Sequence, residues 1–401
     1  MAIVNTILCK MSNLSKPRIK FLAILFSTMM YIPGKVNYRN LSRYSNLSEM
    51  TYLRHFRQVF AFSEFNLHLI KEAIVPCHRL VAGLDCSYIQ KSGRQTYGLD
   101  YFFSGTASCS KRGLEISALA VIDVDAPFGY TLSVSQTPSS DTLGSDEDNR
   151  IDHYLKQVED HAEPLKELGI SYVCVDGYYS KKRFIDGVLA QGLDLIGKLR
   201  SDANLRYLFD GQQKKGPGAP KRYDGKVCFH AFIRWDLVDT IDQVTIYTAV
   251  LNAPRFKRDL RVVCLVDTSN PEKQRYALLF STDIALDAMT LVHFYKARFQ
   301  IEFLFRDAKQ FTGLADAQAR DKNALDFHFN AAMTTLNLLR FMDRSHHRNK
   351  PGIPCSIASW KKRAYNRHLI ERIIQHLDIE PDLIKLHPGM LQLYEYGVIA
   401  A

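Results

Sequence analysis

The sequence of 401 residues lacks several patterns that identify common protein classes. It has no C-x-x-C pair, which argues against a zinc site, and no G-x-x-x-x-G-K-[ST] motif, so no nucleoside triphosphate is implied. It has no internal repeat, and its apolar run Phe21–Ile32 is shorter than the about 20 residues of a membrane-spanning helix. Basic residues precede this run as in a signal peptide, but no A-x-A-like cleavage site follows. We therefore expect a core helix of an N-terminal domain.

Acidic residues are fewer than basic ones, with 42 Asp and Glu against 52 Lys and Arg. The formal net charge of +10 suits a polyanion such as DNA, although a basic soluble protein without such a partner would look the same. Hydrophobic residues make up 46% of the chain, as in a globular protein. Among eight cysteines, Cys174 and Cys264 lie in apolar runs, which predicts buried thiols in a reducing cytosol.

Four polar residues with the spacing Y-x2-R-x3-E-x6-K are the most informative feature that is present: Tyr295, Arg298, Glu302 and Lys309. On one continuous helix they would share a polar stripe, and apolar residues would bury the other sides. A carboxylate can bind a hard metal ion, and cations together with a phenol can bind phosphate oxygens. The alternative is an intrahelical ion pair between Arg298 and Glu302, which would stabilise the helix by only about 0.2–0.5 kcal/mol.

Two aspartates upstream each lie at the end of an apolar run. Asp85 is expected on the first strand of an antiparallel meander, ahead of extended runs at Thr96–Ser104 and Leu114–Val124. Asp176 ends a short buried strand and precedes a helical pattern at Ser180–Gln191, and an acid in that position of an α/β sheet commonly binds a ligand. The alternatives are a strand-edge or turn aspartate for Asp85 and an Asp-Gly turn for Asp176.

The order of these elements is that of the ribonuclease-H-like α/β fold: antiparallel strands with one acid, a helix at about 146–169, a strand with a second acid, and a late helix with a third. The sequence from Arg79 to Leu339 resembles the DDE transposases of bacterial insertion sequences, in the group marked by a Y-R-E-K signature. That group includes the insertion-sequence-four-like elements and the transposases of transposons five and ten. The matching residues are Asp85, Asp176, Tyr295, Arg298, Glu302 and Lys309. Ser87 and Phe299 depart from the residues of many relatives.

The resemblance implies an activity and a set of residue roles. Asp85, Asp176 and Glu302 would be catalytic and would hold two divalent metal ions, Mg²⁺ with Mn²⁺ as a substitute. The implied reaction is cut-and-paste transposition, with cleavage at the element's ends, a hairpin intermediate and strand transfer. The implied partners are inverted-repeat end DNA, target DNA and a second copy of the chain, in the bacterial cytoplasm at the nucleoid. The alternatives are a ribonuclease-H-like nuclease or resolvase without strand transfer, and an inactive DNA-binding repressor.

The resemblance also implies that Tyr295, Arg298 and Lys309 contact DNA phosphates. A second set of DNA contacts is expected in the N-terminal helices, where Arg54 and Arg57 lie on a helix predicted at Glu49–Phe60 after a turn, as in a helix-turn-helix. The alternative there is a plain helical cap on the core.

A third set of DNA contacts is expected in a Gly/Pro/Lys loop that carries Lys214, Lys215, Lys221 and Arg222, although a solvated linker would look the same. Trp235 is expected in the core rather than as a stacking platform for a base. Alternating segments predict strands in this region at Val227–Trp235, Gln243–Leu251, Leu260–Asp267 and Arg275–Ser281.

Five parts of the chain are expected. They are a helical DNA-binding domain, the first part of the core, a β-rich insertion, the second part of the core with the Y-R-E-K helix, and a helical C-terminal region. In the order just given, these parts are expected at residues 1–75, 76–204, 205–286, 287–342 and 343–401.

Overall fold

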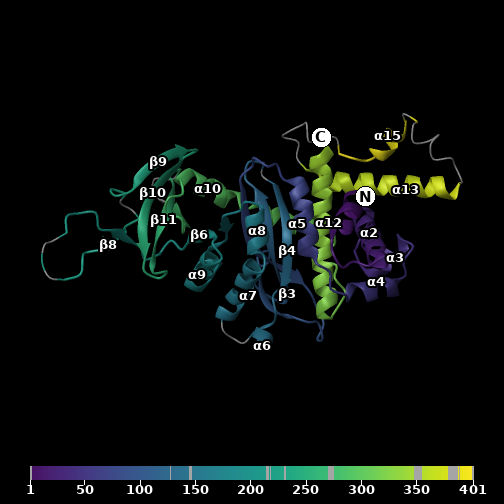
Figure 1. Cartoon of the computed structure of the whole chain (residues 1–401), viewed down its shortest axis with the longest axis horizontal. Helices are drawn as coiled ribbons and strands as arrows, with labels where there is room; N and C mark the ends of the chain where they lie inside the picture. The colour runs from purple at the N-terminus through teal and green to yellow at the C-terminus, as the bar shows by residue number, and fades with distance from the viewer. Residues whose placement is uncertain are drawn as a thin grey trace.

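The structure is a computed structural model, and its fold is a mixed α/β arrangement built on one large sheet (Figure 1). Figure 1 shows the N-terminal helices and α12 at one end of the molecule, and the strands β8 to β11 at the other. The described residues are 2–126, 128–143, 147–213, 216, 218–229, 232–269, 275–346, 355–377, 387 and 389–399.

The sheet has 12 strands in the order β2-β3-β1-β5-β6-β12-β11-β10-β7-β8, with β4 paired to β3 and β9 paired to β10. The strands of its first half are β1 (Leu80–Gln90), β2 (Asp100–Ser104), β3 (Cys109–Asp123), β4 (Phe128–Gln136), β5 (Tyr172–Cys174) and β6 (Asp194–Leu199). Those of its second half are β7 (Arg206–Leu208), β8 (Tyr223–Lys226), β9 (Asp236–Ile241), β10 (Val244–Ala253), β11 (Arg258–Asp267) and β12 (Arg275–Ser281).

Helices precede, interrupt and follow the strands. Before the sheet lie α1 (Ala2–Lys10), α2 (Lys16–Tyr31), α3 (Tyr38–Arg43), α4 (Glu49–Phe56) and α5 (Phe62–Ala73). Between strands lie α6 (Ser140–Leu143), α7 (Glu147–Glu159), α8 (Ala162–Glu167), the 3-10 helix η1 (Gly177–Tyr179) and α9 (Lys182–Ala190). After the sheet come α10 (Ala288–Ala297), α11 (Gln300–Phe311), α12 (Lys322–His346), α13 (Ile357–His376) and α15 (Gly389–Tyr394).

The first half of the sheet is compatible with a ribonuclease-H-like core. β1 pairs antiparallel with β3 and parallel with β5, and β5 pairs parallel with β6. The long strand β3 pairs with β2 through one end and with β4 through the other. The sequence analysis predicted the first three strands but missed β4, whose burial is almost continuous along its length because α12 and α5 cover it.

The second half continues the same sheet, because β12 pairs antiparallel with β6. Strands were expected at four places here, and three of them exist as β10, β11 and β12. The strand expected at Val227–Trp235 was wrong, since the described residues of that segment form turns and irregular backbone. Trp235 is buried, as expected, and its indole Nε1 donates a hydrogen bond of 3.2 Å to the hydroxyl of Tyr207. The five expected parts of the chain remain a prediction.

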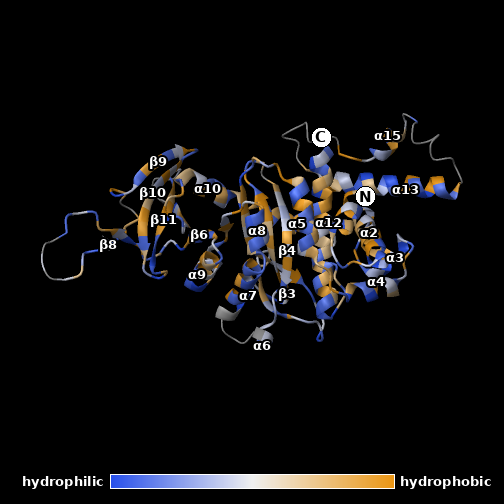
Figure 2. Cartoon of the chain, in the orientation of Figure 1, coloured by the Kyte–Doolittle hydropathy of each residue, from blue (hydrophilic) through white to orange (hydrophobic). Residues whose placement is uncertain are grey.

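Two hydrophobic clusters lie on opposite faces of the sheet. On β1, Val81 and Ile89 belong to the cluster that contains α10, α11, α12 and the N-terminal helices. Ala82 and Leu84 belong to the cluster that contains α7, α8 and α9. Figure 2 shows the hydrophobic residues concentrated in the strands and alternating with hydrophilic ones along α12 and α13. Since side chains alternate along a strand, the odd-numbered residues of β1 face α11.

The apolar run Phe21–Ile32 forms most of α2, which is buried against the rest of the protein, as expected for a core helix. Ser15 caps α2 by accepting the N–H of Arg18, and Ser48 caps α4 in the same way. The helix predicted at Glu49–Phe60 ends earlier, at Phe56. No helix among the described residues is both long and apolar enough to cross a membrane.

Candidate active site

Asp85 and Asp176 lie at the same level of two neighbouring parallel strands. Gly83 of β1 is paired with Cys174 of β5, and each aspartate lies two residues further along its strand direction. Asp85 shares the parity of Val81 and therefore points to the face that α11 covers. Asp176 caps η1, with its Oδ1 accepting the N–H of Tyr178 at 2.9 Å. The Asp-Gly turn considered for Asp176 is thus present. The turn still leaves the Asp176 carboxylate close enough for its charge to act on Asp85.

The Y-R-E-K residues do not lie on one continuous helix, and this part of the prediction was wrong. Tyr295 lies on α10, Glu302 and Lys309 lie on α11, and Arg298 caps the C-terminus of α10. Hydrogen bonds to the third preceding residue tighten the junction, from the N–H of Ile301 to Arg298 and from the N–H of Glu302 to Phe299. Arg298 and Phe299 keep right-handed helical backbone angles, so the polar side chains still meet.

Arg298 joins the first and third acids. Its Nη1 donates to Asp85 Oδ2 at 2.8 Å, and its Nη2 donates to Glu302 Oε1 at 3.2 Å. Burial alone would lower the pKa of Arg298, but Asp85, Tyr295, Glu302 and Asp176 together raise it. The intrahelical pair weighed in the sequence analysis therefore exists, and it is one arm of a larger cluster.

The carboxyl group of Asp85 has a perturbed pKa. Its pKa is raised to about 6, and burial is the largest cause, with the charge of Asp176 acting in the same direction. The charge of Arg298 and the hydrogen bond from the N–H of Cys86 act in the opposite direction. A carboxylate in this state favours a cationic partner, because a nearby positive charge stabilises its ionised form.

On the opposite face of β1, a second contact ties the two aspartate segments together. The Cys86 thiol lies 3.1 Å from the hydroxyl of Tyr179, which belongs to η1 directly after Asp176. Burial raises the pKa of both groups well above their usual values, so both stay protonated. Tyr179 was not identified from the sequence, although its place three residues after Asp176 was a usable signal.

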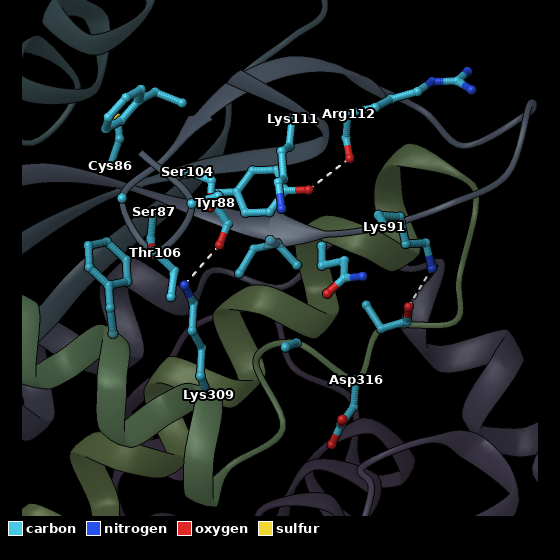
Figure 3. Close-up of a pocket in the computed structure, with 18 of the residues that line it drawn as sticks. Cys86, Ser87, Tyr88, Lys91, Ser104, Thr106, Lys111, Arg112, Lys309 and Asp316 are labelled. Carbon is cyan, nitrogen blue, oxygen red and sulfur yellow. Dashed lines mark hydrogen bonds between the residues drawn. The ribbon is translucent and has the colours of Figure 1, made fainter. Parts of the chain in front are cut away.

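A cavity of about 1560 Å³ opens beside these acids and is lined by both Asp85 and Glu302. Lys309 points into it and donates to the backbone oxygen of Tyr88 at 2.8 Å (Figure 3). Asp176, Tyr295 and Arg298 lie outside its lining. The cavity has further cationic lining residues that were not predicted from the sequence and that lie on several elements: Lys35, Lys91, Lys111, Arg112 and Arg306.

The other predicted DNA contacts lie away from this cavity. Arg54 is exposed on α4, and Arg57 is exposed just after it, with its Nε 3.5 Å from Asp321. Lys221 and Arg222 lie next to β8, at the opposite end of the sheet from β2. Lys214 and Lys215 fall outside the described residues. The structure therefore brings the Y-R-E-K residues and the two aspartates together, and does not bring the other basic residues to them.

The chemistry of the acids fits a hard divalent cation, since all their donors are carboxylate oxygens. Asp85 and Glu302 already share a cation, the guanidinium of Arg298, which shows that the cluster attracts positive charge. Within the described parts of the chain, no three His, Cys, Asp or Glu side chains are arranged around a common point that could hold a metal ion. Arg298 lies where such an arrangement would have to form.

Comparison with known families identifies a domain that contains most of this site. Residues 145–338 match the family model described as the transposase DDE domain. The match covers a little under half of the chain and includes Asp176 and the Y-R-E-K residues, while Asp85 precedes it. No curated protein matches the chain. Residues 145–338 are thus similar to a transposase DDE domain, and this match supports a DDE transposase.

Proposed function

We propose that this protein is a cut-and-paste transposase of a bacterial insertion sequence, in the Y-R-E-K group. One observation carries the proposal: acids from β1, from the turn after β5 and from α11 gather around Arg298 beside a basic cavity. Asp85 lies outside the matched domain, so its place in this cluster is independent of the family match.

In this proposal Asp85, Asp176 and Glu302 hold two Mg²⁺ ions, for which Mn²⁺ can substitute. When bound, such ions lower the pKa of a water nucleophile and stabilise negative charge on the attacking and leaving oxygens. Asp85 would lie between the other two ligands, because Arg298 joins it to Glu302 and the charge of Asp176 acts on it. Asp176 remains anchored through the N–H of Tyr178, which orients its carboxylate.

The DNA strand would lie along the cavity. Lys309 and the cationic lining residues would contact phosphates on the side of Glu302, and Arg298 and Tyr295 would contact the terminal phosphate. Arg54 on α4 would contribute to end recognition, and the basic segment before β8 would contact DNA further away. The partners would be end DNA, target DNA and a second copy of the chain, because two ends must be cut together.

The proposed reaction begins when the oxygen of a water molecule attacks the phosphorus at the element's end. The bond to the 3′ oxygen breaks, the water loses a proton, and the leaving oxygen becomes a 3′-hydroxyl. That hydroxyl attacks a phosphorus of the opposite strand, and a hairpin forms as the bond to the 3′ oxygen of the flanking DNA breaks. A second hydrolysis reopens the hairpin. The freed 3′-hydroxyl then attacks a phosphorus of target DNA, whose own 3′ oxygen leaves with the proton. Each step exchanges one phosphodiester oxygen for another, so no nucleoside triphosphate is needed.

A cleavage assay on duplex DNA that bears the element's inverted repeat tests the proposal. Glu302→Gln should bind this duplex as the wild type does, but cleave it about a thousandfold more slowly or worse. Glu163→Gln is the matched control, because Glu163 is an exposed glutamate on α8 away from the site. Full cleavage by Glu302→Gln would contradict the assignment of the third acid.

Strand transfer separates this function from that of a nuclease. Pre-cut ends incubated with supercoiled plasmid and Mg²⁺ should give joined products with the wild type and none with Glu302→Gln. A protein that cuts the ends and never joins them would instead be a nuclease or resolvase, and one that binds without cutting would be a repressor.

A further inference from the structure

Arg298 is the cation around which the acids of this site gather. Its two terminal nitrogens donate to Asp85 and Glu302, and the charge of Asp176 also acts on it. Only 12% of its side chain is exposed, against 20% for Asp85 and 44% for Glu302. The guanidinium is therefore the most enclosed of these groups.

Few other contacts hold the guanidinium in place. Its carbon lies 5.8 Å from the centre of the Tyr295 ring, and the buried Nε has no hydrogen-bond partner among the described residues. The side chain reaches the cluster from the junction between α10 and α11, where the helix is already broken. Asp85 and Glu302 accept the hydrogen bonds of its two terminal nitrogens, so a group that takes these carboxylates would release the guanidinium from both, with Tyr295 left as its contact.

A divalent cation needs the same oxygen atoms that Arg298 uses. A carboxylate oxygen that bonds a guanidinium has less charge and fewer lone pairs to offer a metal ion. The guanidinium also adds a positive charge at the point where the metal would bind, and like charges repel strongly at such short range. Arg298 and a divalent cation therefore compete for these carboxylate oxygens.

We propose that Arg298 is an internal counter-cation, which neutralises Asp85 and Glu302 until divalent ions displace it, and which then turns to a DNA phosphate. The inference rests on the proposed function for the metal ions themselves. Without metal, Arg298 offsets the repulsion among three carboxylates. With metal, its displaced guanidinium is free to bind phosphate, so that metal and DNA each increase the affinity for the other.

The test is a titration of the full chain with Mn²⁺ in the absence of DNA, followed by electron paramagnetic resonance. It is done at a pH of about 8, where the carboxylates are ionised. Arg298→Ala should bind Mn²⁺ about fivefold more tightly than the wild type, or better, because the competing cation is gone. Arg234→Ala is the matched control and should bind as the wild type does, since Arg234 bridges Asp210 and Asp224 far along the sheet.

Thermal unfolding gives a second readout. Without metal, Arg298→Ala should unfold at a lower temperature than the wild type, and Mn²⁺ should raise its unfolding temperature by more. If Arg298→Ala does not fold without metal, Arg298→Lys keeps the charge but cannot bridge both acids, and should also bind Mn²⁺ more tightly than the wild type.

Two acid variants separate failure of this inference from failure of the proposed function. Asp85→Asn and Glu302→Gln should each weaken Mn²⁺ binding. If they do so while neither Arg298 variant binds more tightly than the wild type, the counter-cation role is wrong and the metal site stands. If the wild type binds no Mn²⁺, or the acid variants bind it equally well, the metal site and the counter-cation role both fail.

Discussion

Arg298 Nη1 donates a hydrogen bond of 2.8 Å to Asp85 Oδ2, although the two residues are 213 positions apart in the sequence. This contact joins β1 to the junction between α10 and α11, and so joins the segment before the matched domain to the domain itself. It also opposes the effect of burial on Asp85, because the charge and hydrogen bond of Arg298 act to lower a pKa that burial raises. The site is therefore assembled by long-range contacts, and its parts can be tested separately.

Lys309 should contribute one phosphate contact. Its Nζ reaches into the basic cavity beside Glu302, and burial lowers its pKa. Lys309→Ala should weaken DNA binding and reduce the slope of log affinity against log salt concentration by about one. Lys156→Ala, on the surface of α7, is the control and should keep the wild-type slope. An unchanged slope for Lys309→Ala would mean that Lys309 only anchors the backbone of Tyr88.

Asn337 should stabilise the edge strand β4. Its amide accepts the N–H of Thr131 at 2.9 Å and donates to the carbonyl oxygen of Thr131 at 2.7 Å, and all these atoms are buried. Asn337→Ala should lower the free energy of unfolding by roughly 2–4 kcal/mol in a urea titration, because two buried backbone groups lose their partners. Asn323→Ala, exposed on the same helix, should change it by less than about 0.5 kcal/mol. Equal effects of the two variants would contradict this role.

Gly313 should be required for the contact between the end of α11 and the N-terminal segment. It has a φ of +77°, and an added Cβ would lie 2.4 Å from Val36 Cβ. Gly169 has a φ of +75° with no atom near its missing Cβ, so Gly169→Ala carries the backbone strain alone. Gly169→Ala should cost about 1 kcal/mol of stability, and Gly313→Ala should cost about 2–4 kcal/mol. Similar losses in thermal unfolding would show that Val36 moves aside freely.

His328 should make the protein less stable in mild acid. The imidazole is buried on α12 and bonds the carbonyl oxygen of Gly313 at 2.8 Å. Burial lowers its pKa, and so does Lys91, while Gly313 and Asp316 act to raise it. The unfolded chain therefore takes up a proton near pH 6.5 that the folded chain resists, and stability falls as the pH drops below about 6.5, by at most about 1.4 kcal/mol per pH unit.

His328→Gln should flatten this dependence, because the glutamine amide can still donate to Gly313 and does not titrate. Urea titrations between about pH 7 and pH 5 measure the slope. His293→Gln, exposed on α10, serves as the control. A slope that is equally steep in His328→Gln and in the control would assign the acid sensitivity to other groups.

The local parts of the fold could be predicted from the sequence, and the long-range parts could not. Apolar runs and turn residues located β1, β5 and α9, because period and capping are properties of a few neighbouring residues. β4 was missed although Tyr130, Leu132 and Val134 alternate with polar residues, so its local signal was present in the sequence and only its burial on both faces depends on distant helices. The pairing of β12 with β6 depends on contacts between distant segments, which no local pattern encodes.

The same division holds within the site. The spacing of Tyr295, Arg298 and Glu302 survives the break between α10 and α11, because the junction keeps right-handed backbone angles and only tightens its hydrogen bonds. The break itself has no proline or glycine to announce it. Arg298 was expected to contact phosphate or Glu302, and its bond to Asp85 could be found only once β1 and α11 were placed together.

The most direct test of the account is whether the three acids act as one unit in DNA cleavage. End-bearing duplex and Mg²⁺ should be given to Asp85→Asn, Asp176→Asn, Glu302→Gln and the triple variant, with end binding measured in parallel. We predict that each single variant binds DNA and cleaves as slowly as the triple variant, since groups that share one task are not additive. A single variant that cleaves at the wild-type rate would contradict the account.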